Sequence, residues 1–400
     1  MVISSLLTAA RRAAPLSRVL REDTASAPPR RVIQLVSSLN CGDAVGNEVS
    51  AIDELLRRNY CRTELWCAHA QPGTLPVRIV SRLPPLSGDD LLIYHFASLC
   101  PFAPQVAEAK CRVLLRYHNV TPSAFFRGYD PAAERATAGA LRQLPALLKR
   151  ADGALPASEF SAADLRRAGY AGPMEVLPVQ LRWSDYAVPP DSNWLRRWGD
   201  GTFNVLSVGR IAPNKRLEDV ISAYAVFRQR HPRSRLILAG SFSPGDGYYL
   251  HLLRHIAALG AENVVFTGHI ELPQLLALYR TAGVYLCMSE HEGFCVPLLE
   301  AMAFGVPVAA YESSAVGETV GSGGVLFARK DFRSVAEDME RLIAERELWR
   351  QRAFARIRDF HYEQSEQRLL RLLHLGERES APLFPFDSGG SIGYNGENIL

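Results

Sequence analysis

The 400-residue sequence lacks the features of a membrane-spanning protein and is poor in cysteine. No apolar run approaches the roughly 18 residues that cross a bilayer, so no transmembrane helix is predicted. The seven cysteines are odd in number and include no C-x-x-C pair, which favours a reducing cytoplasm and argues against a metal cluster. They are Cys41, Cys61, Cys67, Cys100, Cys111, Cys287 and Cys295.

Three sequence patterns are also missing. The turn after the first apolar segment reads G-x-x-x-G, from Gly42 to Gly46, rather than the GxGxxG of dinucleotide-binding proteins. No D-x-D motif occurs, so we expect no bound metal, and we expect no cofactor. No dense patch of basic and aromatic residues occurs, so nucleic acid is not an expected partner.

The composition is that of an ordinary globular protein, with 48% hydrophobic and 22% charged residues. A chain of this length exceeds a single core, so two domains are expected. Residues 1–190 carry 22 Lys and Arg against 17 Asp and Glu, a net charge of +5, whereas the remainder carries 23 against 25, a net −2. A basic first domain is consistent with peripheral contact with an anionic membrane surface.

The second half alternates short apolar segments with amphipathic ones. Predicted strands cover residues 203–209, 236–240, 264–267, 284–288, 306–310 and 324–327, and predicted helices cover 217–230, 248–259, 272–281, 297–304 and 332–346. Apolar strands separated by helices indicate a parallel sheet covered on both faces. Because ligands bind beyond the carboxyl ends of such strands, the residues that follow them should share one rim. These are Arg210, Ser241, Gly268 and Glu292.

The first half follows the same pattern. A strand over 31–38 leads through the glycine turn to a helix over 49–58, and Asp43 in that turn can cap a helix. A second strand, over 112–117, leads directly into His118. Ser158 is placed to cap the helix that follows it.

The segment from Ser289 to Ala303 is the most informative part of the chain. Glu292 and Glu300 lie on either side of Pro297, which can open a helix because its missing N–H would be unpaired there. The backbone N–H groups near Gly293, Phe294 and Cys295 would then lie at a helix N-terminus, which favours phosphate. The two carboxylates suit sugar and ribose hydroxyls.

This segment closely resembles the donor-site signature of the retaining glycosyltransferases of family 4, also called glycosyl transferases group 1. The run from Gly209 and Arg210 to Lys215 resembles the Gly-Arg-x4-Lys element of that family. Lysine is rare, with only four among 45 basic residues, so a lysine at this position supports the likeness. The resemblance covers about residues 31–375 and implies an α/β GT-B fold: two Rossmann-like, doubly wound parallel-sheet domains that face a cleft.

The resemblance also implies roles for single residues. Arg210 and Lys215 would clamp the donor diphosphate together with the backbone near Phe294 and Cys295, where the family more often has glycine in place of Cys295. Glu292 would hold the donor sugar and Glu300 the nucleotide ribose. His118 would contact the donor sugar. Gly42 and Asp43 would form a turn over the donor phosphate and the acceptor, and Gly268 would belong to the same rim.

Each of these residues also has an ordinary structural explanation. Arg210 and Lys215 fit solvated loop cations, Asp43 fits a helix cap, and His118 fits a satisfied polar group. Glu300 fits a carboxylate favoured by the helix dipole. The sequence leaves both explanations open.

We therefore expect a metal-independent, retaining hexosyltransferase that uses a GDP- or UDP-sugar and a glycan or lipid-linked acceptor in bacterial surface polysaccharide or glycoconjugate biosynthesis. The alternatives are a catalytically silent GT-B subunit and a Rossmann oxidoreductase or epimerase. The expected domains are 31–190 on the acceptor side and 200–358 on the donor side, then a crossover helix over 359–376. Residues 1–30 and 377–400 are expected to be a disordered extension and a flexible tail. The expected location is cytoplasmic, with peripheral membrane contact.

Overall fold

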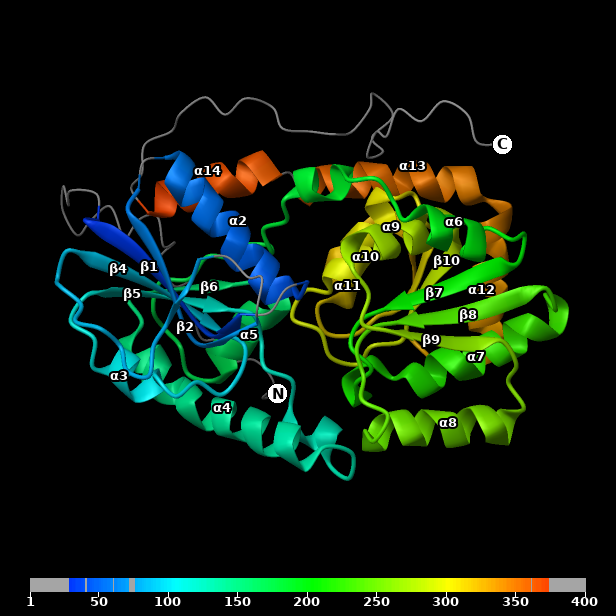
Figure 1. The fold of residues 1–400 in the computed structure, drawn as a ribbon, viewed down its shortest axis with the longest axis horizontal. Helices are drawn as coiled ribbons and strands as arrows, with labels where there is room; N and C mark the ends of the chain where they lie inside the picture. The colour runs from blue at the N-terminus through cyan, green and yellow to red at the C-terminus, as the bar shows by residue number, and fades with distance from the viewer. Residues whose placement is uncertain (1–28, 40–41, 60, 72–75, 361, 374–400) are drawn as a thin grey trace, which may run out of the picture.

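The computed structural model describes residues 29–39, 42–59, 61–71, 76–360 and 362–373. The predicted tail over 377–400 and nearly all of the predicted extension over 1–30 lie outside these residues. The described chain forms two six-stranded sheets whose neighbouring strands are parallel (Figure 1). No helix in the described ranges combines the length and the apolar character needed to cross a bilayer.

The first sheet has the strand order β3-β2-β1-β4-β5-β6. Its strands are β1 (Arg31–Leu39), β2 (Thr63–Ala70), β3 (Arg78–Ile79), β4 (Asp90–Phe96), β5 (Arg112–Tyr117) and β6 (Gly153–Pro156). The helices of this half are α2 (Ala44–Arg58), α3 (Ala103–Ala107), η1 (Ser123–Phe126), α4 (Pro131–Arg150) and α5 (Glu159–Arg167). On β1, Val32 belongs to one buried cluster with Ile52 of α2, whereas its neighbour Ile33 belongs to another cluster with Leu144 of α4. Since successive strand residues point to opposite faces, helices cover both faces of the sheet.

The second sheet has the strand order β12-β11-β10-β7-β8-β9. Its strands are β7 (Phe203–Val208), β8 (Ser234–Ala239), β9 (Val264–Gly268), β10 (Ala282–Cys287), β11 (Val308–Tyr311) and β12 (Val325–Phe327). Its helices are η3 (Pro213–Lys215), α7 (Leu217–Arg230), α8 (Gly247–Leu259), α9 (Leu272–Thr281), α10 (Val296–Ala303), α11 (Val316–Val320), η4 (Gly321–Gly323), α12 (Phe332–Ala344) and α13 (Arg346–Ile357). Val205 packs with Val220 of α7, and Leu206 packs with Leu298 of α10, so this sheet is also covered on both faces.

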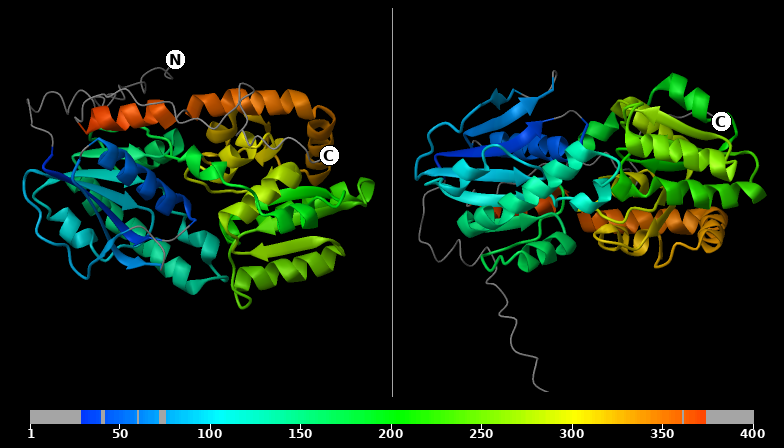
Figure 2. Two further views of the ribbon diagram at one scale, coloured as in Figure 1. Left: turned by 45° about the horizontal axis from the view of Figure 1, so that its top comes forward. Right: turned by 90° about the horizontal axis from the view of Figure 1, so that it is seen from below.

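Two segments connect the halves. The chain passes from the first sheet to the second through η2 (Trp183–Ala187) and α6 (Ser192–Trp198). After α13 and η5 (Arg358–Phe360), helix α14 (Tyr362–Leu372) returns to the first half and lies beside α2 (Figures 1 and 2). Leu369 and Leu373 are fully buried there, in one cluster with Val32 and Leu91. The last described helix therefore completes the core of the first domain.

The strands and helices predicted for the second half are all present, with ends shifted by at most two residues. The prediction omits α11, which has five residues, and the charge-rich α13. In the first half, the prediction that a helix begins at residue 49 is wrong, because α2 begins at Ala44. Asp43 caps this earlier start by accepting a hydrogen bond from the Gly46 backbone N–H at 2.6 Å.

A buried ion pair attaches α2 to the first sheet. Arg116 on β5 donates from Nε to Glu48 Oε2 at 3.1 Å and from Nη2 to Glu48 Oε1 at 2.6 Å. Both side chains are completely buried. Arg116 Nη1 also donates to the carbonyls of Leu155 and Leu177. The desolvation of each charge is offset only while the other is present.

We predict that Arg116→Leu lowers the free energy of unfolding by about 3–5 kcal/mol, because it leaves the Glu48 carboxylate buried and unpaired. The matched control is Arg166→Leu, which removes an arginine of α5 that lies 3.7 Å from Glu159 and whose partner is also exposed, with side-chain exposures of 56% and 68%. This control should change stability by less than about 1 kcal/mol. Urea denaturation followed by circular dichroism measures both. Equal losses in the two variants would contradict the structural importance of the buried pair.

Candidate functional site

Two loops at the carboxyl ends of β7 and β10 are joined to one another. The Glu290 backbone N–H donates to the Asn214 carbonyl at 2.9 Å, and Asn214 Nδ2 donates to the His291 carbonyl at 3.0 Å. These contacts bring together two predicted site residues: Lys215 Nζ donates to Glu292 Oε1 at 2.6 Å. The family resemblance gave both residues roles at the donor, and the structure brings their side chains together.

The two loops border a small cavity that is partly open to solvent. Its polar lining residues include Ser207, Lys215, Ser289, Glu292 and Cys295. Gly209, with φ +143°, also lines it, and a Cβ atom at this position would lie 3.2 Å from Lys215 Cε. A side chain at residue 209 would therefore crowd the lysine.

The Lys215–Glu292 pair is largely shielded from solvent, with side-chain exposures of 19% and 10%. Burial lowers the pKa of Lys215, but the adjacent Glu292 carboxylate outweighs that effect and holds the pKa above its ordinary value. The ammonium group is therefore charged at neutral pH. It provides a fixed cation in the wall of the cavity.

Helix α10 begins at the same cavity. Cys295 is its N-cap residue, with φ +75°, and Pro297 lies in the first turn. Pro297 has no N–H and the Leu298 N–H donates to the Cys295 carbonyl at 3.1 Å, so the start of α10 offers the backbone N–H groups of Cys295 and Val296 as donors beside Lys215. The Cys295 thiol hydrogen-bonds to the Cys287 thiol, and this bond together with burial raises the pKa of Cys295. A protonated thiol is a weak nucleophile, so Cys295 contributes to the cavity through its backbone N–H rather than through its side chain.

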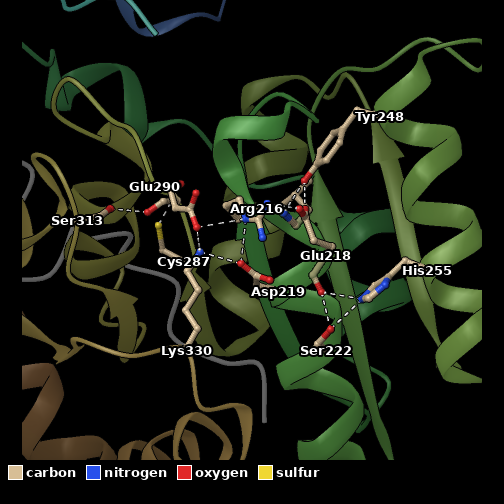
Figure 3. A network of polar contacts seen from close by, with 12 residues as sticks. Arg216, Glu218, Asp219, Ser222, Tyr248, His255, Cys287, Glu290, Ser313 and Lys330 are labelled. Carbon is tan, nitrogen blue, oxygen red and sulfur yellow. Dashed lines mark hydrogen bonds and ion pairs between the residues drawn. The ribbon is translucent and has the colours of Figure 1, made fainter. Parts of the chain in front are cut away.

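A network of ion pairs outside the cavity links the loop after β7 to the loop after β10 (Figure 3). Lys330 Nζ donates to Asp219 Oδ2 and to Glu290 Oε1, at 2.7 Å each. Arg216 pairs with Asp219 at 3.1 Å and Glu290 at 3.4 Å. Arg216 directly follows Lys215, and Glu290 lies two residues before Glu292. The network therefore holds the backbone next to both members of the Lys215–Glu292 pair.

Arg210 lies elsewhere on the rim. It is exposed, and its guanidinium carbon lies 5.7 Å from the centroid of the Phe126 ring in the first domain. It is not among the residues that line the cavity. Its predicted contact with a diphosphate therefore remains a prediction.

Glu300 is held by two tyrosines that sequence reasoning missed. Tyr186, from η2, donates to Glu300 Oε1 at 2.5 Å, and Tyr279, from α9, donates to Oε2 at 2.7 Å. Burial raises the pKa of Glu300, although the two tyrosine bonds act in the opposite direction. The residue does not line the cavity. Its predicted role toward a ribose stays a prediction.

His118 lies where the two domains meet. A Cβ atom on Gly293 would come within 2.2 Å of the His118 carbonyl oxygen, so only glycine permits this approach. Ser158, which caps α5 as predicted, donates from its hydroxyl to the Gly293 carbonyl at 2.7 Å. The Glu159 backbone N–H donates to the Glu318 carboxylate at 2.9 Å. The loop that carries Glu292 is therefore docked on the first domain.

The structure places the remaining predicted residues as follows. Gly42, with φ +79°, faces the second domain, and a Cβ atom there would lie 3.9 Å from His269 Cε1. Gly268, with φ +74°, ends β9 directly before His269. Phe294 is buried, with its ring edge-to-face against Phe360 at 5.6 Å.

One group of side chains in the described residues is close enough to share a metal ion: Glu48, His95 and His118. Both oxygens of Glu48 already accept hydrogen bonds from Arg116. A second cation there would be repelled by the guanidinium group. The set is better explained as a hydrogen-bonded network, and we assign no metal to it.

Comparison with known proteins finds a family match in the second half of the chain. Residues 196–356 match the model of the family described as glycosyl transferases group 1. The match covers the second sheet, both loops and α10.

Relatives among characterised proteins match part of the chain. The O-antigen chain mannosyltransferase B of Escherichia coli is 28% identical over 192 residues, which are 46% of this chain and 44% of that protein. The glycogen synthase of Mycobacterium tuberculosis is 33% identical over 143 residues, 35% of this chain and 34% of that protein. The serotype-specific mannosyltransferase WbdA of Escherichia coli is 28% identical over 151 residues, 37% of this chain and 18% of that protein. The matches span less than half the length of these relatives.

Solved structures match the whole fold. Anabaena Alr3699/HepE in complex with UDP-glucose superposes with a TM-score of 0.68 at 18% identity, over 86% of this chain and 99% of that one. Sucrose-phosphate synthase from Thermosynechococcus elongatus gives 0.67 at 18% identity, over 86% and 98%. The GT-B fold predicted from the sequence is confirmed.

The contact between Gly293 and His118 generates a prediction. Gly293→Ala should lower the free energy of unfolding by about 1–3 kcal/mol, because the added methyl group meets backbone atoms that cannot rotate away. Gly245→Ala is the matched control, since a Cβ atom at Gly245 would meet nothing within 4 Å. Thermal denaturation compares the two. A melting temperature for Gly293→Ala equal to that of the control would show that the domains do not dock as described.

Proposed function

We propose that this protein is a retaining glycosyltransferase that moves a hexosyl unit from a GDP- or UDP-sugar to a glycan or lipid-linked acceptor. The observation that carries the proposal is the cavity in which Lys215, Glu292 and the start of α10 converge. The group 1 match over residues 196–356 supports it, as do the relatives named as mannosyltransferases. Those relatives also support a role in bacterial surface polysaccharide or glycoconjugate biosynthesis.

The donor diphosphate would bind between Lys215 and the N–H groups at the start of α10. Charge develops on the leaving diphosphate as the glycosidic bond breaks, and a preorganised cation with backbone donors stabilises that charge. Arg210, which precedes Lys215 in the same loop and lies beside Phe126 of the first domain, would add a second cation. Two cations and a helix N-terminus can offset the diphosphate charge, so we propose that no metal is required.

The Lys215–Glu292 pair would separate when the donor binds. Lys215 would turn to the diphosphate, and Glu292 would accept hydrogen bonds from sugar hydroxyls. Glu292 is not a covalent nucleophile in this proposal. The acceptor attacks from the side of the leaving group, and the departing phosphate takes the acceptor's proton, which retains the anomeric configuration. We also propose that Glu300 binds the ribose by exchanging a tyrosine hydroxyl for a ribose hydroxyl.

The location proposed for the protein is the cytoplasm, with peripheral contact between the basic first domain and the inner membrane. The basic excess of residues 1–190 supports this contact. The acceptor would then be reached on the cytoplasmic face.

The reaction class is tested by product stereochemistry. With an α-linked donor selected by screening GDP- and UDP-sugars, the product should keep the α-anomer, and EDTA should leave the rate unchanged. Proton NMR of the product and initial rates with and without EDTA measure both. An inverted product would exclude the retaining mechanism, and strict Mn²⁺ dependence would show that the charges at Arg210 and Lys215 do not suffice. Nucleotide binding without transfer from any donor would favour the catalytically silent subunit.

Lys215→Ala should lower turnover by about tenfold to a thousandfold, the effect of removing one preorganised charge at a developing anion. Lys149→Ala is the matched control, because Lys149 is an exposed lysine in the last turn of α4. Thermal denaturation reports any instability from the carboxylate left unpaired at Glu292. Wild-type turnover at a saturating donor concentration would exclude Lys215 from the site.

A further inference from the structure

A row of buried polar side chains runs through the first domain to His118. Gln34 of β1, His95 of β4 and His118 follow one another at hydrogen-bond distance, with 3.0 Å between Gln34 Oε1 and His95 Nε2 and 3.0 Å between His95 Nδ1 and His118 Nε2. Gln34 and His95 are each 1% exposed, and the His118 side chain is 6% exposed. The two imidazole rings are inclined by only 19°.

The glutamine fixes the direction of these hydrogen bonds. Gln34 Nε2 donates to the Val49 carbonyl at 3.2 Å, so Gln34 presents its oxygen to His95. An amide oxygen only accepts, and therefore His95 Nε2 carries a proton. Burial lowers the pKa of His95 well below its ordinary value, so the ring is neutral and its Nδ1 is an acceptor.

His118 must then donate to His95 from Nε2. Burial, together with the charge of Arg116, also lowers the pKa of His118, so this ring is neutral too. A neutral imidazole carries one proton, and the hydrogen bond made by one nitrogen decides the state of the other. His118 Nδ1 is therefore left with a lone pair.

No donor among the described residues serves that lone pair. Its neighbour at 3.4 Å is Glu48 Oε2, which is itself an acceptor and holds Arg116 Nε at 3.1 Å. Glu48 Oε1 accepts from Arg116 Nη2 and from the Gln180 backbone N–H. The ion pair thus keeps the carboxylate ionised and pointing at the ring, where it cannot supply a proton. Nδ1 is therefore the ring nitrogen that lacks a hydrogen-bond donor among the described residues.

We propose that His95, oriented by Gln34, is a positioning residue that holds His118 in the Nε2–H tautomer, so that His118 Nδ1 accepts a hydrogen bond from a hydroxyl of the donor sugar. The inference rests on the proposed function, which places the sugar beside Glu292, the residue next to Gly293. His118 meets Gly293 through its carbonyl oxygen. The site then requires a hydroxyl that donates, because both ring nitrogens cannot donate at once.

The tautomer is measured directly by NMR of the protein labelled with ¹⁵N-histidine, with His118→Asn identifying the His118 signals. In the wild type, His118 should be protonated at Nε2. His95→Phe removes the acceptor and should give a mixture of tautomers. His95→Asn should restore the Nε2–H form, because the asparagine Oδ1 can replace the lost Nδ1. A wild-type His118 protonated at Nδ1, or a His95→Phe spectrum like that of the wild type, would overturn the inference.

Binding and kinetics separate positioning from a general loss of structure. In His95→Phe, kcat/KM for the nucleotide sugar should fall about three- to tenfold, as expected for one neutral hydrogen bond, and His95→Asn should recover most of it. Calorimetric affinity for bare UDP or GDP should stay at the wild-type value, because the network contacts only the sugar side. A parallel fall in affinity for the bare nucleotide would indicate a merely structural role and overturn the inference.

Failure of the proposed function can be distinguished from failure of the positioning role. If the wild type neither bound UDP or GDP nor transferred a sugar, the role of His118 toward a sugar would be overturned, whatever the tautomer. If the wild type transferred sugar and His95→Phe matched it in rate, the function would stand and the positioning role would be overturned.

Discussion

The hydrogen-bonded ion pair between Lys215 and Glu292 is the interaction on which the site depends. It joins the loop after β7 to the loop after β10, and it keeps two opposite charges in a partly buried cavity wall at little electrostatic cost. Neither charge is committed to a structural role deeper in the core. In the proposed function, the diphosphate of the donor would pair with Lys215 and the sugar hydroxyls would donate to Glu292, so donor binding would separate the pair and leave each group with a partner.

The parallel sheets explain why this pair forms where it does. Parallel strands place their carboxyl ends along one edge, and loops at that edge can meet residues distant in sequence. The first domain contributes to the site from the carboxyl edge of its own sheet. His118 follows β5, and its carbonyl oxygen packs on Gly293. Glu48 of the buried Glu48–Arg116 pair lies next to the His118 ring, so the part of the first domain that contacts Gly293 adjoins a fully buried ion pair. Stability of the first core and geometry of the site are therefore linked.

Local patterns sufficed to predict the strands of the second half, because apolar segments alternate there with amphipathic ones. The roles of Lys215 and Glu292 came from the family resemblance instead, and the structure brings these two side chains together. Local patterns did not reveal the tyrosines on Glu300, since Tyr186 comes from a connecting segment whose path the sequence pattern does not specify. The network at His118 left a signal that could have been used. Arg116 and His95 interrupt otherwise apolar buried strands, and a charged or polar residue in such a strand requires a buried partner.

The most direct test of the account is a crystal structure of the protein with UDP or GDP bound. The account predicts that the diphosphate lies within hydrogen-bond distance of Lys215 Nζ and of the backbone N–H groups at the start of α10, with Glu292 released from Lys215. A nucleotide bound outside this cavity, with the Lys215–Glu292 pair intact, would contradict it.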